Sequence, residues 1–174
     1  NNRVTELLDK CSKTNRFKDM KICGYRNIFN QESAEQFSGF CFLYGKKWEQ
    51  KAVVLKGTDD TLVGWHEDFD LSWKEEIPSQ RDSLKYFADV CHHFKSGKIT
   101  LIGHSKGGNL AVNTAVKCGE KLQRRIADVY NFDGPGFSEA FFESDEFMRV
   151  ETKIHSYFPS FSLVGVVFSH QKNF

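Results

Sequence analysis

Apolar positions along this chain repeat in two ways, one typical of strands and the other of helices. The run 37-FSGFCFLYG-45 alternates and ends on glycine, and the run 51-KAVVLKG-57 is short, apolar and also ends on glycine. Both patterns predict strands. Lys46 and Lys47 lie in the turn between the two runs, so we expect the two strands to form a hairpin.

Two of the predicted helices are long. Between Ser79 and Phe94, apolar side chains recur at spacings of three and four, which places them on one face of a helix. Ser79 is the expected N-cap, with Pro78 directly before it. The Ala-rich stretch 110–117 predicts the second long helix, ended by Gly119. Shorter helices are expected at 4–11, at 15–20 and around 139–148.

Three further strands are predicted at 99–102, 126–134 and 152–159. With the helices between them, they give the order strand, helix, strand, helix, strand, which is typical of a parallel sheet with crossover helices. We therefore expect residues 1–174 to form a single α/β domain with three layers and a mostly parallel central sheet. An all-β fold is the alternative, and the strongly helical stretch around Leu110 disfavours it.

Composition narrows the classes of protein that fit. Lys and Arg total 24 and Asp and Glu total 23, a net charge of +1, which argues against a protein that binds nucleic-acid phosphates. No apolar run approaches the ~20 residues that cross a bilayer, so no transmembrane segment is expected. The five cysteines form no CxxC pair, so we expect reduced thiols, a cytoplasmic location and no metal site. The chain starts at Asn1 rather than Met, and we expect it to be a fragment.

Residues 103–107 read Gly-His-Ser-Lys-Gly, a Gly-x-Ser-x-Gly motif between a predicted strand and a predicted helix. This is the pattern of a nucleophile elbow, a sharp turn that exposes a serine hydroxyl. The neighbours two residues either side of Ser105 must then be almost free of side chain, and Gly103 and Gly107 meet that need. Gly108 allows the helix to pack close to the sheet. The alternative is a tight turn with an incidental serine.

A serine nucleophile needs a base and an acid that orients the base. His104 adjoins Ser105 on the turn, so its side chain is expected to point away, and His155 lies inside a strand where a packing role is expected. His170 follows an apolar run and is the candidate base. Asp133 stands at a strand end and is the candidate acid, although a turn-forming role fits it equally well.

The oxyanion of such a reaction needs two backbone N–H donors. One comes from the residue after the nucleophile, here Lys106, whose amide lies at the N-terminus of the predicted helix. The other is expected after an earlier strand, where Gly57 permits a bend and Thr58 offers its N–H and hydroxyl. An ordinary solvated turn explains this Asp-rich segment equally well.

Three blocks of sequence carry a resemblance to a known group. The segments 55-LKGTDDTLVGWHEDF-69 and 101-LIGHSKGGNLAV-112 resemble the fungal-type (class 3) lipases of the α/β-hydrolase superfamily. Together with a third segment that follows them, 129-VYNFDGPGFS-138, they resemble a bacterial family of lipase-like proteins of unknown function still more closely. The three blocks occur in the same order in that family. The resemblance runs from about Phe17 to the C-terminus, and it implies an α/β-hydrolase-like fold.

The resemblance also implies roles for individual residues and shows where this chain differs from the lipase pattern. It matches Ser105 to the nucleophile and Thr58 and Lys106 to the oxyanion donors, and it gives Trp65 and Asp68 structural roles. Lysines replace the usual Arg and Leu at positions 56 and 106. The place of the lipase acid is held by Ser162, and the lipase histidine lies further downstream than residue 174. The resemblance thus implies a domain truncated at both ends.

Two classes of function remain. The first is a serine hydrolase, of esterase, lipase or thioesterase type, that cleaves a small-molecule or lipid acyl ester through an acyl-enzyme on Ser105 and needs no metal or organic cofactor. Acyl transfer to an acceptor other than water would use the same intermediate. The second is a catalytically inactive hydrolase fold kept as a binding or scaffolding domain. The sequence leaves the oligomeric state open.

Overall fold

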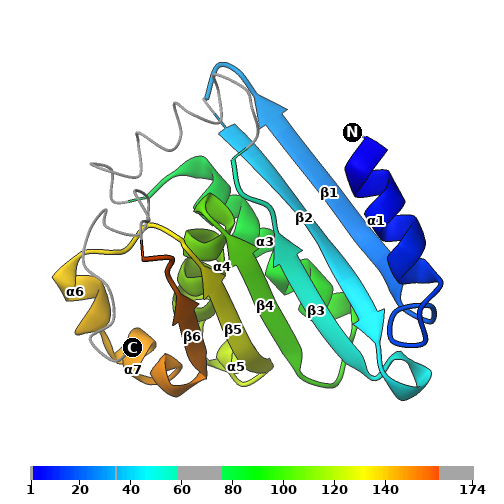
Figure 1. Ribbon diagram of the computed structural model, residues 1–174. Helices are drawn as coiled ribbons and strands as arrows, with labels where there is room; N and C mark the ends of the chain where they lie inside the picture. The colour runs from blue at the N-terminus through cyan, green and yellow to red at the C-terminus, as the bar shows by residue number, and fades with distance from the viewer. Residues whose placement is uncertain (1, 34, 59–75, 161–174) are drawn as a thin grey trace.

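The structure, a computed structural model, describes residues 2–33, 35–58 and 76–160. In this part of the chain, six strands form one sheet (Figure 1). The strands are β1 (Lys21–Asn30), β2 (Glu35–Tyr44), β3 (Gln50–Leu55), β4 (Ile99–His104), β5 (Ile126–Phe132) and β6 (Ile154–Tyr157). The helices are α1 (Asn2–Ser12), α3 (Pro78–His93), α4 (Lys106–Lys117), α5 (Glu120–Gln123), α6 (Glu139–Phe142) and α7 (Asp145–Met148), with short 3-10 helices at Lys46–Trp48 and Glu151–Lys153.

The sheet is antiparallel at one side and parallel at the other. Its order is β1-β2-β3-β4-β5-β6, with antiparallel pairing from β1 to β3 and parallel pairing from β3 to β6. The predicted β2–β3 hairpin and the predicted parallel strands with crossover helices are therefore confirmed. Because β3 to β6 run in one direction, their carboxyl ends meet at one edge of the sheet, where loops from several strands come together.

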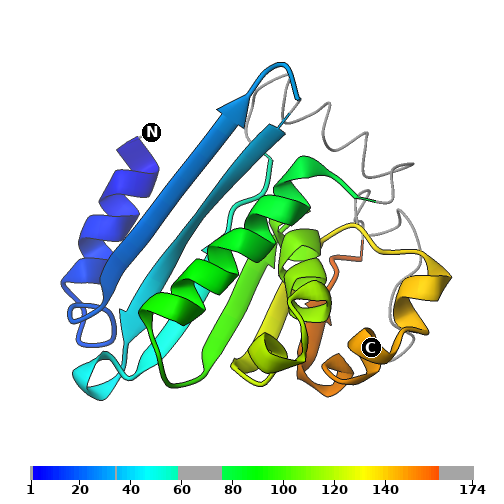
Figure 2. The ribbon, with the colours of Figure 1, turned by 180° about the vertical axis from the view of Figure 1, so that it is seen from behind.

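Helices α3 and α4 cover one face of the sheet (Figure 2). The buried core lies between them and the strands, because central strands such as β3 and β4 turn apolar side chains toward this face. Its largest fully buried apolar side chains include Phe37, Phe87, Leu55, Leu101 and Leu110. Helix α1 runs beside β1 at the antiparallel side of the sheet (Figures 1 and 2).

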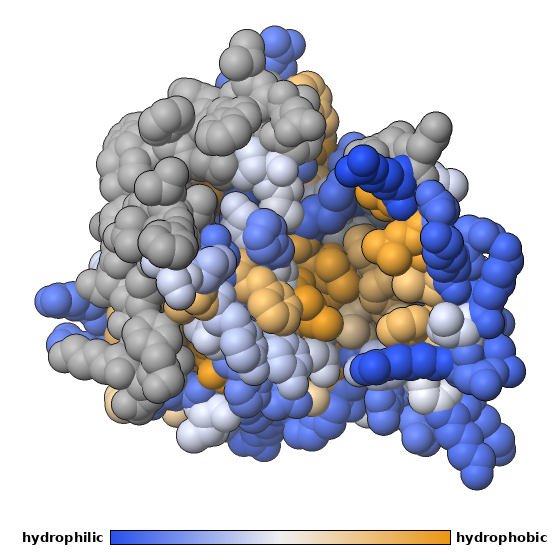
Figure 3. Space-filling view, viewed as in Figure 1, coloured by the Kyte–Doolittle hydropathy of each residue, from blue (hydrophilic) through white to orange (hydrophobic). Residues whose placement is uncertain are grey.

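The other face of the sheet carries apolar side chains as well. Figure 3 shows them gathered around a hollow over the central strands. A groove of about 660 Å³ lies there, between the residues that follow α1 and the sheet. Its apolar lining includes Phe17, Met20, Phe42 and Ile102. The residue after Ile102 is the first glycine of the motif, so β4 connects this groove to the turn at Ser105.

The structure departs from the sequence expectations at several boundaries. Strand β1 was not expected, because Gly24, at a φ of 63°, lies in a bulge between Cys23 and Arg26 that interrupts the alternation of its side chains. Residues 15–20 form turns rather than a helix. The N-cap of α3 is Ile77 rather than the expected Ser79.

The cause of this shift is local. Pro78 suits the first position of a helix, and the Gln80 side chain accepts a hydrogen bond from the Ile77 amide at 3.0 Å. The stretch 139–148 splits into α6 and α7, because the Ser144 hydroxyl accepts a hydrogen bond from the Phe147 amide and caps a new helix.

Candidate active site

Ser105 occupies a sharp turn between β4 and α4. Its backbone has a φ of 54° and a ψ of −132°, a region that costs a residue with a side chain roughly 1–3 kcal/mol. The Ser105 amide donates to the Phe132 carbonyl at 2.9 Å, and the Ser105 carbonyl accepts from Gly108 at 2.8 Å. The turn is therefore held by β5 on one side and by the first turn of α4 on the other.

The glycines around Ser105 permit contacts that any side chain would block. A Cβ atom at Gly103 would collide with the Gly107 carbonyl, and one at Gly107 with the Leu55 carbonyl at the end of β3. A Cβ atom at Gly108 would collide with the side-chain oxygen of Asn131. The first turn of α4 thus lies directly against β3, β4 and β5, and this close approach forces the bend at Ser105.

The segment that leads to Thr58 passes beside the same turn. Lys56 donates its amide to the Ser38 carbonyl at 2.9 Å, which extends the pairing of β2 with β3. At the next residue, a Cβ atom on Gly57 would lie 2.7 Å from the His104 carbonyl oxygen and 3.4 Å from the Ser105 Cβ atom. The structure therefore brings the chain at Gly57 into contact with the serine turn, and Thr58 is the residue that follows.

Lys106 points into the protein rather than into solvent. It is 1% exposed, and its Nζ atom donates to both the main-chain and the side-chain oxygen of Gln36, at 2.8 Å each. Only the backbone amide of Lys106 was predicted to have a role, and Gln36 was not predicted. The available signal was the lysine itself, which stands where the resemblance has a leucine.

Asp133 follows β5 at the same edge of the sheet. Its φ is 56°, and its amide donates to the Tyr157 carbonyl at 2.9 Å. Its neighbour Gly134 donates to the side-chain oxygen of Asn131 at 3.0 Å. Asp133 and the exposed His104 line one open cavity of about 260 Å³, completed by Phe132, Tyr157, Phe158 and Pro159. The structure thus places Asp133 and His104 together at the carboxyl ends of β4, β5 and β6.

His155 is engaged elsewhere. Its Nε2 atom lies 3.1 Å from a carboxylate oxygen of Asp128, and its ring stacks on Tyr130 with centroids 5.1 Å apart. These contacts occupy the ring within the sheet, which agrees with a packing role. The other predicted participants, His170, Ser162, Trp65 and Asp68, lie outside the described residues.

A buried polar network supports the loop that carries Asp133. Asn109 is 1% exposed and donates to the carbonyls of Pro135 and Gly136, at 3.0 and 3.3 Å. Its side-chain oxygen accepts from Gln80 at 2.9 Å. The start of α3, helix α4 and the loop after β5 are thereby joined. Neither Asn109 nor Gln80 was predicted from the sequence, although Asn109 stands out as a polar residue beside the apolar run Leu110–Val112.

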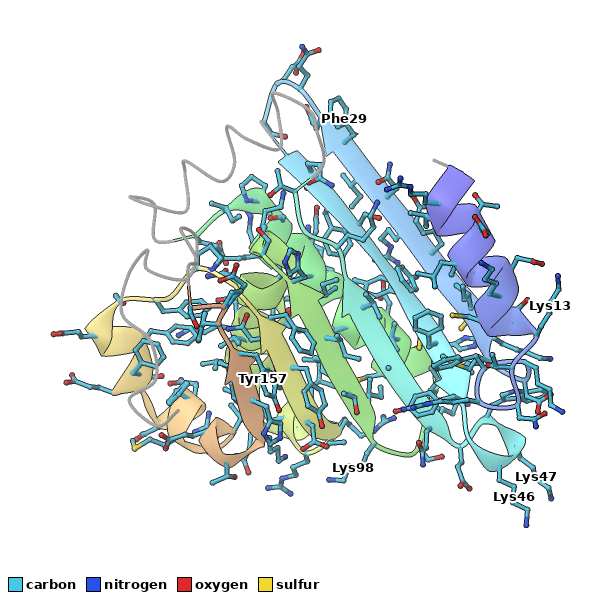
Figure 4. All side chains as sticks on the ribbon, in the orientation of Figure 1. Lys13, Phe29, Lys46, Lys47, Lys98 and Tyr157 are labelled. Carbon is cyan, nitrogen blue, oxygen red and sulfur yellow. The ribbon has the colours of Figure 1, made fainter. Side chains whose placement is uncertain are left out.

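Three lysine side chains mark the opposite edge of the sheet. Figure 4 shows Lys46, Lys47 and Lys98 there, at the turn after β2 and just before β4. Among the residues described, no group of three or more His, Cys, Asp or Glu side chains is arranged to hold a metal ion. Within the same residues, no helix has the length and apolar character needed to cross a membrane.

Solved structures of lipases share this fold. A structure of M37 lipase has a TM-score of 0.64 and 16% identity, over 94% of this chain and 62% of the lipase. A fungal lipase, solved as a complex with an inhibitor, has a TM-score of 0.60 and 18% identity, over 92% of this chain and 66% of the lipase. The expected α/β-hydrolase-like fold is therefore confirmed, and the chain spans less than two thirds of either lipase.

Sequence comparison identifies the family. A comparison with curated proteins finds no match. A family model described as Mbeg1-like matches residues 11–174, which is most of the chain. The chain therefore belongs to the Mbeg1-like family.

Proposed function

We propose that this protein is a serine hydrolase that cleaves an acyl ester through an acyl-enzyme on Ser105. The observation that carries the proposal is the strained turn at Ser105, with a φ of 54° between a buried strand and a helix N-terminus. Strain of this kind persists mostly where function uses it. Three glycines around the turn permit the close packing that maintains it.

The chemistry follows from that turn. The Ser105 hydroxyl attacks the ester carbonyl, its proton passes to a base, and the carbonyl oxygen gains negative charge. The N–H groups of Lys106 and Thr58 hold this oxyanion. The contact of Gly57 with the Ser105 turn supports the pairing of these two donors. The alcohol leaves with a proton from the base, and water then releases the acyl group.

We assign the remaining roles to Asp133 and His170. Asp133 is the proposed acid, and the hydrogen bond from the Ser105 amide to the carbonyl of Phe132, the residue before Asp133, supports this role. His170 is the proposed base, which follows the chain order of serine, acid and histidine in α/β-hydrolases.

The proposed substrate is a small-molecule or lipid acyl ester. The two solved structures are described as lipases, and their similarity to this chain supports an ester of this class. The cavity at His104, the residue before Ser105, has an apolar lining from Phe132, Tyr157 and Phe158, which suits an uncharged group of the substrate.

Intact-mass labelling with a fluorophosphonate tests this function. This probe phosphonylates an activated serine, loses fluoride and adds a fixed mass. We expect one adduct on the wild-type protein, no adduct on Ser105→Ala and an unchanged adduct on Ser138→Ala. Ser138 is a matched control, because it is exposed and makes no capping hydrogen bond with its side chain. A wild-type protein without an adduct, or an adduct that survives Ser105→Ala, would contradict the proposal and favour a non-catalytic binding domain.

A further inference from the structure

The side chain of Lys106 is buried and forms hydrogen bonds with a residue far away in the sequence. A lysine in the first turn of a helix at the edge of a sheet would ordinarily extend into water, since its charge is costly to bury. Here the side chain is 1% exposed and reaches Gln36, 70 residues earlier in the chain. Two of its three possible hydrogen bonds go to this one residue, at 2.8 Å each.

Gln36 is itself a fixed partner. It is 3% exposed and lies at the second position of β2, a strand that pairs with a neighbour on each side. It offers Lys106 both a main-chain oxygen and a side-chain oxygen, so the ammonium group is held at two points. Hydrogen bonds to a charged donor are roughly twice as strong as neutral ones. The first residue of α4 is thus tied to a strand that does not adjoin β4.

The same strand also holds the other side of the proposed oxyanion site. The Ser38 carbonyl, two residues after Gln36, accepts the Lys56 amide at 2.9 Å. Lys56 leads directly through Gly57 to Thr58. Residues 36–38 of β2 therefore anchor both segments that supply the two N–H donors, one through the backbone of Lys56 and one through the side chain of Lys106.

An apolar residue at position 106 would fill the same space without burying a charge. It would lack the hydrogen bonds that fix the orientation of the first turn of α4. The first N–H groups of a helix have no acceptor within the helix, so their orientation depends on how the first turn is held. A side chain fixed at two points restrains the peptide to which it belongs. Oxyanion donors act only at about 2.7–3.1 Å from the developing charge, so a small rotation of this peptide would matter.

We propose that Lys106 and Gln36 act as positioning residues. By tying the Lys106 peptide to β2, the strand that also holds Lys56, they set the distance and the angle between the two oxyanion donors. This inference rests on the proposed serine hydrolase function. It assigns to the Lys106 side chain a role separate from that of its own backbone amide. Neither side chain needs to touch the substrate.

Ester hydrolysis by the full chain tests the inference, with p-nitrophenyl butyrate as the probe. Lys106→Met keeps the length of the side chain and removes the donor. We expect kcat to fall about 30-fold, because loss of a whole oxyanion donor costs ~100- to 1000-fold and misalignment costs less. We expect KM to change by less than threefold. Gln36→Met removes only one of the two acceptors, and we expect a fall of about fivefold. The control is Lys117→Met, at the exposed last residue of the same helix, with unchanged kinetics.

A second measurement separates positioning from a merely structural role. A trifluoromethyl ketone forms a tetrahedral adduct with an oxyanion, whereas butyrate does not. If Lys106 positions the oxyanion donors, Lys106→Met lowers the affinity for the ketone by the same factor as it lowers kcat/KM. The affinity for butyrate stays unchanged. A merely structural role would lower the melting temperature without this parallel. If Lys106→Met does not fold, Gln36→Met decides by the same comparison.

The outcomes also distinguish the two proposals. Wild-type protein that neither hydrolyses the ester nor takes up the fluorophosphonate contradicts the hydrolase function itself. A different result contradicts only the positioning role. In it, the wild-type protein does both, and the variants at positions 36 and 106 keep kcat and ketone affinity within twofold of the wild-type values.

Discussion

The buried Asn109 network gives the sharpest test of how the loop after β5 is held. The Asn109→Ala variant removes three hydrogen bonds, two to the carbonyls of Pro135 and Gly136 and one from Gln80. Gln80 is 4% exposed, so its amide is left without this acceptor away from water. Each lost hydrogen bond in such a setting costs about 1 kcal/mol or more. We therefore expect the free energy of unfolding to fall by about 3–4 kcal/mol.

Urea denaturation followed by far-UV circular dichroism measures this change. For a slope of about 2 kcal/mol per molar urea, the midpoint should fall by roughly 1.5–2 M. The matched control is Asn113→Ala, one turn later on α4. Asn113 is 7% exposed, and its side chain makes no hydrogen bond with the described residues. An Asn109→Ala variant whose midpoint shifts no further than that of Asn113→Ala would refute the stabilising role of the Asn109 network.

Three further predictions follow from the packing and the charges. Gly103→Ala should lower the melting temperature by more than 10 °C or prevent folding, because its Cβ atom meets the Gly107 carbonyl; an alanine variant of wild-type stability would contradict this. Burial raises the pKa of the Cys41 and Cys118 thiols to about 12. The folded state favours the neutral thiols, so their contribution to the free energy of unfolding is fully present below the unfolded pKa near 8.5–9. Above that pH, the free energy of unfolding falls by up to roughly 1.4 kcal/mol per pH unit and thiol. Urea midpoints that stay constant from pH 8 to 10.5 would disprove this pH dependence. His155→Ala should leave fluorophosphonate labelling of Ser105 intact, because the ring pairs with Asp128; loss of labelling would assign His155 to the site.

Local features of the fold were accessible to sequence reasoning. The turn at Ser105 was predicted because its requirements are local, a strand, two glycines at fixed spacing and a helix. The hairpin of β2 and β3 was predicted for the same reason. Strand β1 was missed because its bulge at Gly24 breaks the alternation, and because many of its side chains are exposed on both faces.

The long-range hydrogen bonds that hold the candidate site could not be predicted from local sequence patterns. The contact of Lys106 with Gln36 joins residues 70 positions apart, and that of Gln80 with Asn109 joins residues 29 apart. No periodicity records such pairs, since each depends on how the strands are ordered in the sheet. The role of Asp133 was likewise undecided between a turn and an acid, because its neighbours His104 and Tyr157 come from other strands.

The order of the strands has a consequence for folding on the ribosome. Each strand pairs with the one synthesised immediately before it, so the sheet can grow by one strand at a time. The meander of β1, β2 and β3 involves only nearby segments and is expected to form early, whereas the parallel strands wait for their crossover helices. The amide of Ser105 is bonded to Phe132 of β5. The serine turn is thus expected to reach its strained geometry only after β5 has emerged and docked, late in synthesis.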